Sequence, residues 1–184
     1  MTGKSGSVDV AILMGSKSDL ETMRPAAKAL QGLGLTVAVR VLSAHRTPEE
    51  AAAFVRESTA NGVKVFICGA GGAAHLAGAV AAHTTRPVIG VPIAAGTLGG
   101  FDSLLSTVMM PPGMPVATVA VGGAENAGLL AAQIIAGSDP ALAKRVEAER
   151  AGRRRKVLQS DEEVRAEFEK SSDSKSSDSK SGGG

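Results

Sequence analysis

The chain has 184 residues, a formal net charge of +2 at pH 7, 43% hydrophobic residues and only 2% aromatic residues. This length is sufficient for one domain with a sizeable buried core. The weak net charge and the scarcity of aromatic rings argue against a nucleic-acid binder, which needs a basic surface for phosphates and rings for base stacking.

Short apolar runs alternate along the chain with segments whose apolar residues follow a helical spacing. The predicted strands are residues 9–14, 36–42, 63–70, 87–92 and 115–121. The predicted helices are residues 19–33, 48–60, 73–83, 99–110 and 123–136. Five such units predict an α/β fold with a parallel sheet covered on both faces. We expect a three-layer, doubly wound, flavodoxin-like architecture with strand order 2-1-3-4-5, in which residues 1–138 form one catalytic domain.

The composition changes after residue 138. Residues 139–170 are highly charged with sparse apolar positions, which predicts an additional C-terminal helix, interrupted near Gly152, that packs on a neighbouring subunit. Its RRRK run (153–156) is balanced by nearby acidic residues and indicates a solvated face. Residues 171–184, SSDSKSSDSKSGGG, cannot bury a core and are predicted to form a disordered tail.

In a doubly wound sheet, ligands bind outside the carboxyl ends of the strands at the switch point of the winding. With strand order 2-1-3-4-5 this point lies between strands 1 and 3. The loops after the first three strands are therefore the candidate site.

The first of these loops reads MGSKSDLETM, residues 14–23. Ser18 and Glu21 have the spacing of a capping box, which predicts that a helix begins here. A helix start also offers free N–H groups to a phosphate, and Ser16 and Ser18 add hydroxyl donors. Asp19 suits a ribose diol better than a phosphate, because a carboxylate accepts hydrogen bonds.

The second loop reads LSAHRTPEE, residues 42–50. Thr47 and Glu50 again have capping-box spacing, with Pro48 at the first helical position, so a helix start accounts for them. Ser43 and Arg46 have no such explanation. A cation is disfavoured at a helix start, and Arg46 there indicates an anionic ligand, which arginine binds through paired hydrogen bonds. Beside that site, His45 is the candidate acid–base group.

The third loop, CGAGGAAHLAGAVAAH (68–83), contains a G-x-G-x-x-A pattern. It follows the third strand, and no acidic residue lies at a strand end about 20 residues further on, so we reject a nicotinamide cofactor. The alternatives are close helix–strand packing and a glycine-lined pocket for a small flat ligand with His75 at its rim. His83, at the end of the predicted helix, is expected only to complement the helix dipole.

Other chemistries lack their motifs. The sequence contains no P-loop and no zinc-binding pattern, and its single cysteine, Cys68, lies in an apolar run and is expected to be buried and inert. No apolar run approaches the roughly 20 residues that span a bilayer, and the first residues have no signal core, so a cytoplasmic protein is expected. What remains is a site without cofactor or metal for proton transfer on a small phosphorylated ribosyl compound.

Several stretches occur in one order between about residues 8 and 136: MGSKSD, SAHRTPE, GAGGAAHL, PVIGVP and the run DSLLS…MPPGMPVATVAVG…NAGLLAAQI. Together they resemble the class I N5-carboxyaminoimidazole ribonucleotide mutases of bacterial purine biosynthesis, in the phosphoribosylaminoimidazole carboxylase catalytic subunit family. The sequence departs from that family at Ala77, where proline is usual, and at Met109, where glutamine is usual.

The resemblance implies a cofactor-independent isomerase that moves a carboxylate from the exocyclic nitrogen of an aminoimidazole ribonucleotide to ring carbon C4. It implies His45 as the catalytic acid and base, with the phosphate held by Ser18, Ser43 and Arg46 and the ribose by Asp19. The imidazole and carboxylate pocket implied by the family is formed by Ser16, Ala70, Gly71, His75 and Leu76.

The family also implies a homo-octamer without nucleic-acid or membrane partners, supplied with substrate by an ATP-dependent carbamate-forming synthetase. Two alternatives stay open at this point. One is a class II aminoimidazole ribonucleotide carboxylase that uses CO2 directly. The other is a non-catalytic nucleotide-binding module, against which His45 is the principal sequence feature.

Overall fold

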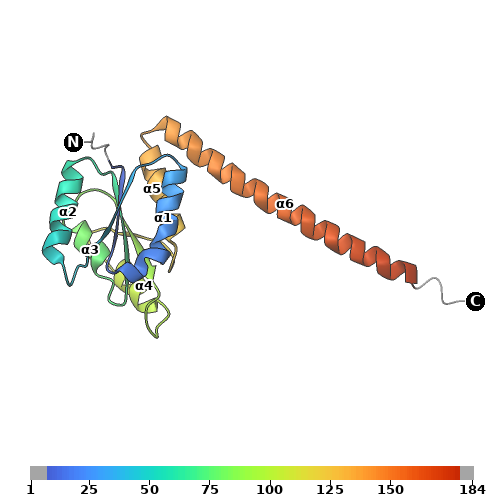
Figure 1. Cartoon of the computed structure of the whole chain (residues 1–184), viewed down its shortest axis with the longest axis horizontal. Helices are drawn as coiled ribbons and strands as arrows, with labels where there is room; N and C mark the ends of the chain where they lie inside the picture. The colour runs from blue at the N-terminus through green and yellow to red at the C-terminus, as the bar shows by residue number, and fades with distance from the viewer. Residues whose placement is uncertain (1–7, 179–184) are drawn as a thin grey trace, which may run out of the picture. The chain divides into compact units, whose positions relative to one another are not determined.

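A computed structural model describes the backbone of residues 8–178 and the side chains of residues 8–169 (Figure 1). The chain divides into two compact units after Ala143. The first unit contains a five-stranded sheet with its flanking helices. The second consists of the remainder of a long C-terminal helix, and each unit is described here by itself.

The sheet confirms the predicted topology. Its order is β2-β1-β3-β4-β5, and each strand pairs with its neighbours in parallel. The strands are β1 (Val10–Met14), β2 (Val37–Val41), β3 (Val65–Gly71), β4 (Val88–Ile93) and β5 (Ala117–Thr118). The last strand is much shorter than predicted, because it is an edge strand preceded by Pro115, which has no N–H to donate to the sheet.

Helices cover both faces of this sheet in the first unit (Figure 1). The helices are α1 (Leu20–Gly32), α2 (Pro48–Ala60), α3 (Leu76–Ala81), α4 (Phe101–Val108) and α5 (Ala124–Ala136), and a 3-10 turn, η1 (Lys17–Asp19), leads into α1. Helices α1 and α5 pack together on one face, and α2 and α3 on the other. The three-layer arrangement is therefore the one that the sequence predicted.

The predicted helix 73–83 begins later than expected, at Leu76. The residues before it form a turn in which Gly72 and Ala74 have positive φ angles of 62° and 41°. Glycine adopts a positive φ readily, whereas Ala74 does so against the usual preference of a residue with a Cβ, and the turn delays the helix beyond the end of β3. The shorter helix leaves His75 at its N-cap position rather than inside it.

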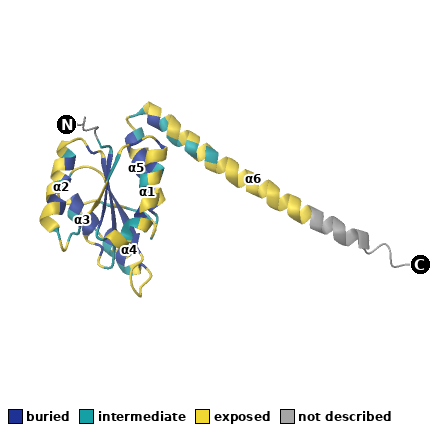
Figure 2. Cartoon of the chain, viewed as in Figure 1, coloured by how far each residue is buried: buried dark blue, intermediate teal, exposed yellow. Residues whose placement is uncertain are grey.

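The central strands form the core (Figure 2). Every residue of β1 and β4 is buried, as are the first residues of β3, as expected for parallel strands covered on both faces. Between α1 and α5 the contact is very close: a Cβ on Gly128 would lie 2.7 Å from the carbonyl oxygen of Ala26. A glycine at this position therefore allows the two helices to cover the sheet together.

Cys68 lies in β3 and is fully enclosed. Burial raises the pKa of its thiol far above the usual range, because the apolar surroundings disfavour the thiolate. The structure thus agrees with the expected inert thiol.

The C-terminal helix α6 (Pro140–Asp178) corrects one prediction, because it continues through Gly152 without a break. A helical glycine costs only about 1 kcal/mol relative to alanine, and the surrounding Arg, Ala and Glu residues are good helix formers. The helix also continues past residue 170, where the extension was expected to end. Of the expected tail, residues 179–184 lie outside the described residues.

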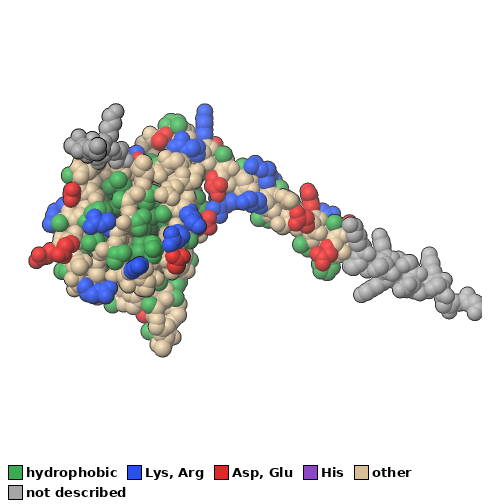
Figure 3. Space-filling view, viewed as in Figure 1, with side chains coloured by type: hydrophobic (Ala, Val, Ile, Leu, Met, Phe, Trp, Pro, Cys, Tyr) green, Lys and Arg blue, Asp and Glu red, His purple; other side chains and the backbone are tan. Residues whose placement is uncertain are grey.

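The second unit carries charged side chains of both signs along the described part of α6 (Figure 3). Between these charged residues lie exposed apolar side chains, among them Val157 and Phe168, which are 69% and 68% exposed. In the part of the chain that the structure describes, no helix is long and apolar enough to cross a membrane.

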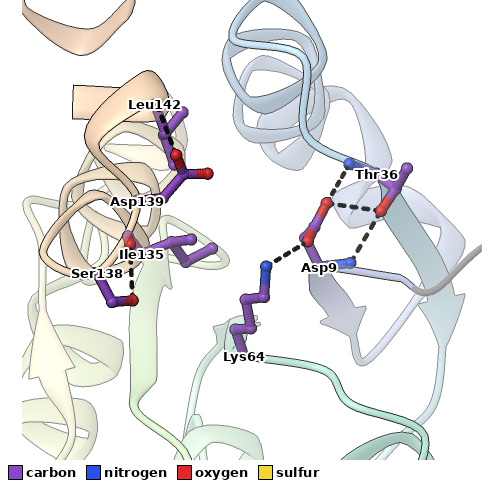
Figure 4. A network of polar contacts seen from close by, with 7 residues as sticks. All are labelled: Asp9, Thr36, Lys64, Ile135, Ser138, Asp139 and Leu142. Carbon is purple, nitrogen blue, oxygen red and sulfur yellow. Dashed lines mark hydrogen bonds and ion pairs between the residues drawn. The ribbon is translucent and has the colours of Figure 1, made fainter. Parts of the chain in front are cut away.

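A polar network closes the sheet at the ends of the strands opposite the three predicted site loops (Figure 4). The Asp9 carboxylate accepts hydrogen bonds from the N–H and hydroxyl of Thr36 at 2.9 and 2.7 Å, and it pairs with Lys64 at 2.9 Å. Nearby along α5 and α6, Asp139 caps the start of α6 by accepting the N–H groups of Ala141 and Leu142. The contacts of Asp9 with Thr36 and Lys64 join the segments that enter β1, β2 and β3.

We expect Asp9→Asn to lower the free energy of unfolding at pH 7 by roughly 1–2 kcal/mol. This is the usual contribution of a hydrogen bond to a charged group, reduced because the site is partly exposed. Burial alone would raise the pKa of Asp9, but the hydrogen bonds from Lys64 and Thr36 outweigh it and lower the pKa below its ordinary value. A lowered pKa adds stability above the unfolded-state value of about 3.9, and this stability is lost as pH falls through the folded-state value.

Urea titrations of the wild type and Asp9→Asn between pH 7 and pH 3 would measure the free energy of unfolding of each. The wild type should be more stable than Asp9→Asn down to about pH 4, and this difference in stability should narrow only below that pH. Asp161→Asn, on an exposed part of α6, is the control and should change little. An Asp9→Asn deficit that stayed the same at every pH would contradict the role of the charge.

Candidate active site

The loops after β1, β2 and β3 surround one cavity of about 320 Å³ at the carboxyl ends of the strands. All the predicted site residues except Ser18 line it. The lining residues that the sequence predicted are Ser16, Asp19, Ser43, His45, Arg46, Ala70, Gly71, His75 and Leu76. The structure therefore brings together residues that are up to 60 positions apart in the sequence, as the switch-point argument predicted.

In the first loop, the capping box lies two residues earlier than predicted. Ser16, not Ser18, is the N-cap: its hydroxyl accepts the Ser18 N–H at 3.3 Å, while the Asp19 carboxylate accepts the Ser16 N–H at 3.0 Å. Glu21 instead pairs with Arg24 on the surface at 2.6 Å. The reason is the 3-10 turn η1, which begins the helical conformation at Lys17, ahead of α1.

Hydrogen bonds within the first loop occupy part of the acceptor capacity of the Asp19 carboxylate. One carboxylate oxygen holds the Ser16 N–H, and the other is 3.5 Å from the Ser18 hydroxyl. The Ser18 hydroxyl itself lies 2.9 Å from that of Ser16. Because a carboxylate has about four lone-pair positions, Asp19, which lines the cavity, still has acceptor capacity.

The second loop corrects the other predicted capping box. Thr47 is the N-cap of α2, but its side chain makes no capping hydrogen bond. Its hydroxyl accepts the Ser43 N–H at 2.8 Å and lies 3.2 Å from the Ser43 carbonyl oxygen. The hydroxyl of Ser43 in turn accepts the N–H groups of His45 and Arg46, each at 3.3 Å. Thr47 therefore serves the site loop and not the helix end.

Arg46 links the second loop to the first. Its Nη2 donates to the carbonyl oxygen of Gly15 at 2.6 Å. A guanidinium has five N–H donors, so this bond leaves others for an anion. The side chain is exposed, and it lines the cavity beside Ser16 and Ser43.

The two histidines of the site are in direct contact. Nε2 of His45, from the β2–α2 loop, is 2.6 Å from Nδ1 of His75, at the start of α3. Their rings meet edge to face, with centroids 4.8 Å apart and an interplanar angle of 79°. One of the two nitrogens must carry the shared proton, so each ring restricts the tautomer and orientation of the other. The contact places an acid–base pair at the cavity wall.

The third loop brings backbone close to the cavity. A Cβ on Gly71 would lie 2.7 Å from the Cβ of Ala95 and 3.1 Å from the carbonyl oxygen of Ile93. Glycine is therefore required where β3 passes the loop after β4. Two glycines of the motif divide the two interpretations: Gly69 packs against Met23 of α1, whereas Gly71 packs against the residues after β4 and lines the cavity.

Sequence reasoning missed four lining residues: Gly15, Ala44, Ala74 and Ala95. Gly15, Ala44 and Ala74 neighbour predicted residues, and the small size of their side chains leaves no chemical signal. Ala95 follows β4, a strand whose loop was not considered. Because β4 is adjacent to β3 in the predicted strand order, the topology alone indicated that its carboxyl end borders the site.

The arrangement can bind a small anion and move protons. Arg46 and the hydroxyl groups offer donors, and the imidazole pair offers a proton that can be given and taken back. Among the described residues, no group of His, Cys, Asp and Glu side chains is placed to hold a metal ion.

Comparison with known proteins adds independent information. Residues 9–156 match the family model described as AIR carboxylase. The chain is 56% identical over 143 residues to the N5-carboxyaminoimidazole ribonucleotide mutase of Brucella melitensis, covering 77% of this chain and 88% of that protein. It is 49% identical over 157 residues to the mutase of the same name from Bacillus subtilis, covering 84% and 97%. The crystal structure of Treponema denticola PurE superposes with a TM-score of 0.77 at 31% identity, covering 84% of this chain and 97% of that one.

Proposed function

This chain belongs to the AIR carboxylase family, and on that premise we propose that it is an N5-carboxyaminoimidazole ribonucleotide mutase of purine biosynthesis. It isomerises N5-carboxyaminoimidazole ribonucleotide to 4-carboxy-5-aminoimidazole ribonucleotide. The observation that carries the chemistry is the pair of imidazoles in contact at the wall of the cavity. The relatives that share about half of its residues supply the substrate class.

The reaction needs one group that acts first as an acid and then as a base. His45 protonates the exocyclic nitrogen, the bond between that nitrogen and the carboxylate breaks, and CO2 is released within the cavity. The electron-rich C4 then attacks CO2, and His45 removes the C4 proton, which restores the aromatic ring. The proton that His45 gives up in the first half is replaced in the second, so no cofactor is consumed.

Confinement supports this sequence of steps. CO2 held beside C4 reacts as though it were at a high local concentration. Ala70, Gly71 and Leu76, together with Ser16 and His75, form the proposed imidazole and carboxylate pocket. Gly71 is suited to it because its backbone can approach the ligand.

The remaining cavity groups are proposed to hold the ribose phosphate. Arg46 and Ser43 lie in the loop just before α2, whose helix dipole favours an anion. Ser18 is proposed to complete the phosphate site from the first loop, although it does not line the cavity itself. Asp19 is proposed to accept hydrogen bonds from the ribose hydroxyls with its remaining lone pairs.

A homo-octamer stays a prediction, and exposed apolar side chains of the first unit support self-association. Phe101 and Met109 are 62% and 76% exposed, and Leu98, Val108 and Met114 near them are also exposed. One buried oxygen of Asp102, at the start of α4, has no hydrogen-bond partner among the described residues. Exposed apolar residues close together in the sequence, rather than scattered singly, indicate an interaction surface. The cytoplasmic location and the synthetase that supplies the substrate also stay predictions.

The decisive assay supplies N5-carboxyaminoimidazole ribonucleotide without ATP, metal or biotin and follows formation of the C4 carboxylate. The mutase should convert it. A parallel reaction with aminoimidazole ribonucleotide and low bicarbonate should carboxylate it poorly. Efficient carboxylation there would favour the direct use of CO2, and ribonucleotide binding without turnover in either reaction would indicate a non-catalytic module.

A further inference from the structure

Thr47 holds the segment that carries His45, although Thr47 itself does not line the cavity. Its hydroxyl accepts the Ser43 N–H at 2.8 Å and donates to the Ser43 carbonyl oxygen at 3.2 Å, so both polar groups of Ser43's backbone meet one side chain. A hydroxyl can do both, because it has one donor and two lone pairs. A second bond, from the Thr47 N–H to the same carbonyl oxygen, measures 3.0 Å.

Ser43 passes this constraint to the catalytic residues. Its side-chain hydroxyl accepts the backbone N–H groups of His45 and Arg46. The loop from Ser43 to Thr47 is therefore closed by hydrogen bonds at both of its ends. Within it, the backbones that carry the proposed acid–base group and the proposed phosphate ligand are held together.

Thr47 also connects this loop to a rigid element. Its carbonyl oxygen accepts the N–H of Ala51 in the first turn of α2 at 3.0 Å. Ala51 and Val55 on that helix are buried in the hydrophobic core. The position of the loop is thereby set by the core and not by the exposed side chains of the loop.

The position of the His45 loop must be accurate, because the 2.6 Å contact between the His45 and His75 side chains joins two different loops. Without the Thr47 hydroxyl, the part-buried Ser43 N–H loses its partner and the loop can shift. A shift of about 1 Å at a reacting group is enough to cost a factor on the order of 100 in rate.

We propose that Thr47 is a positioning residue for the mutase reaction, which acts through Ser43 to hold His45 against His75. This inference rests on the proposed function for its kinetic consequence and on the hydrogen bonds alone for its structural one. It also explains why a threonine that has the sequence spacing of a helix cap makes no capping bond.

The test compares Thr47→Val, which keeps the shape and removes the hydroxyl, with Thr47→Ser, which keeps the hydroxyl. The matched control is Thr59→Val, at the other end of α2, where the lost hydroxyl lies 2.9 Å from that of Thr84 and outside the cavity. Thr47→Val should lower kcat about 10- to 100-fold. Thr47→Ser should restore most of the rate, and the control should match the wild type in kcat.

A second readout does not need the proposed function. In the protein without substrate, imidazole nitrogen chemical shifts should report the His45–His75 contact in the wild type, in Thr47→Ser and in the control, and its loss in Thr47→Val. A Thr47→Val enzyme with normal kcat and an intact contact would overturn the proposal, as would a serine variant as impaired as valine. If the wild type has no mutase activity, the proposed function fails, and the nitrogen shifts alone decide the role of Thr47.

Discussion

Replacement of His45 by asparagine is expected to abolish the carboxylate transfer while leaving ribonucleotide binding nearly unchanged. Asparagine fills much of the same space and keeps hydrogen-bonding capacity, but it cannot donate and recover a proton near neutral pH. General acid–base catalysis contributes about 10²–10⁴-fold to a rate, and here one group performs both the protonation and the deprotonation. The loss in kcat should therefore be at least at the upper end of that range.

Turnover of N5-carboxyaminoimidazole ribonucleotide and calorimetric binding of the product would measure the two effects separately. His83→Asn is the matched control, since His83 lies after α3 and lines a different, smaller cavity between α2 and α3. It should leave both quantities unchanged. Normal turnover in His45→Asn would contradict the proposed acid–base role of His45. An equal loss of binding and turnover would indicate that His45 binds the substrate instead.

Arg46→Ala is expected to weaken phosphorylated ligands by about 1.5–3 kcal/mol, the usual contribution of a hydrogen bond to a charged group. The dephosphorylated nucleoside should bind with little change. The comparison is necessary because Arg46 also donates to the Gly15 carbonyl oxygen, and loss of that contact loosens the first loop for both ligands. Only the difference between the two ligands reports the phosphate contact.

Calorimetry with the product ribonucleotide and its nucleoside would give both affinities. Arg46→Lys should recover part of the phosphate affinity, because lysine keeps the charge but lacks the paired donors of arginine. Arg40→Ala is the control: its guanidinium lies 4.9 Å from the Phe54 ring centre, away from the cavity. Equal losses for ribonucleotide and nucleoside would contradict a phosphate role for Arg46.

Much of the fold could be predicted because its signals are local and periodic. Helix α2 begins and ends where the sequence placed it, since Pro48 marks a first helical turn and apolar residues follow at helical spacing. Buried parallel strands appear as short apolar runs, and the alternation of strands and helices restricts the topology to a few choices. The sheet order then follows, and it places the loops that carry His45 and His75 at one edge.

The site residues were predictable for a related reason. Polar side chains such as those of Ser43 and Arg46 stand out in the sequence because a helix start does not account for them, although the structure shows that both also make hydrogen bonds in the loops. Small lining residues such as Ala95 do not, because an alanine has the same appearance in a core, a helix or a pocket. Finding them requires the coordinates of the neighbouring strand.

The sequence alone thus determined the order of the elements, the class of fold and the side chains that could carry proton transfer. Only the tertiary structure decided which partner each polar group takes. The capping box belongs to Ser16 rather than Ser18, and the Thr47 hydroxyl bonds Ser43 rather than its own helix. The contact between His45 and His75 likewise joins loops 30 residues apart. A hydroxyl or an imidazole accepts several partners of similar energy, and the packing of separate loops selects among them.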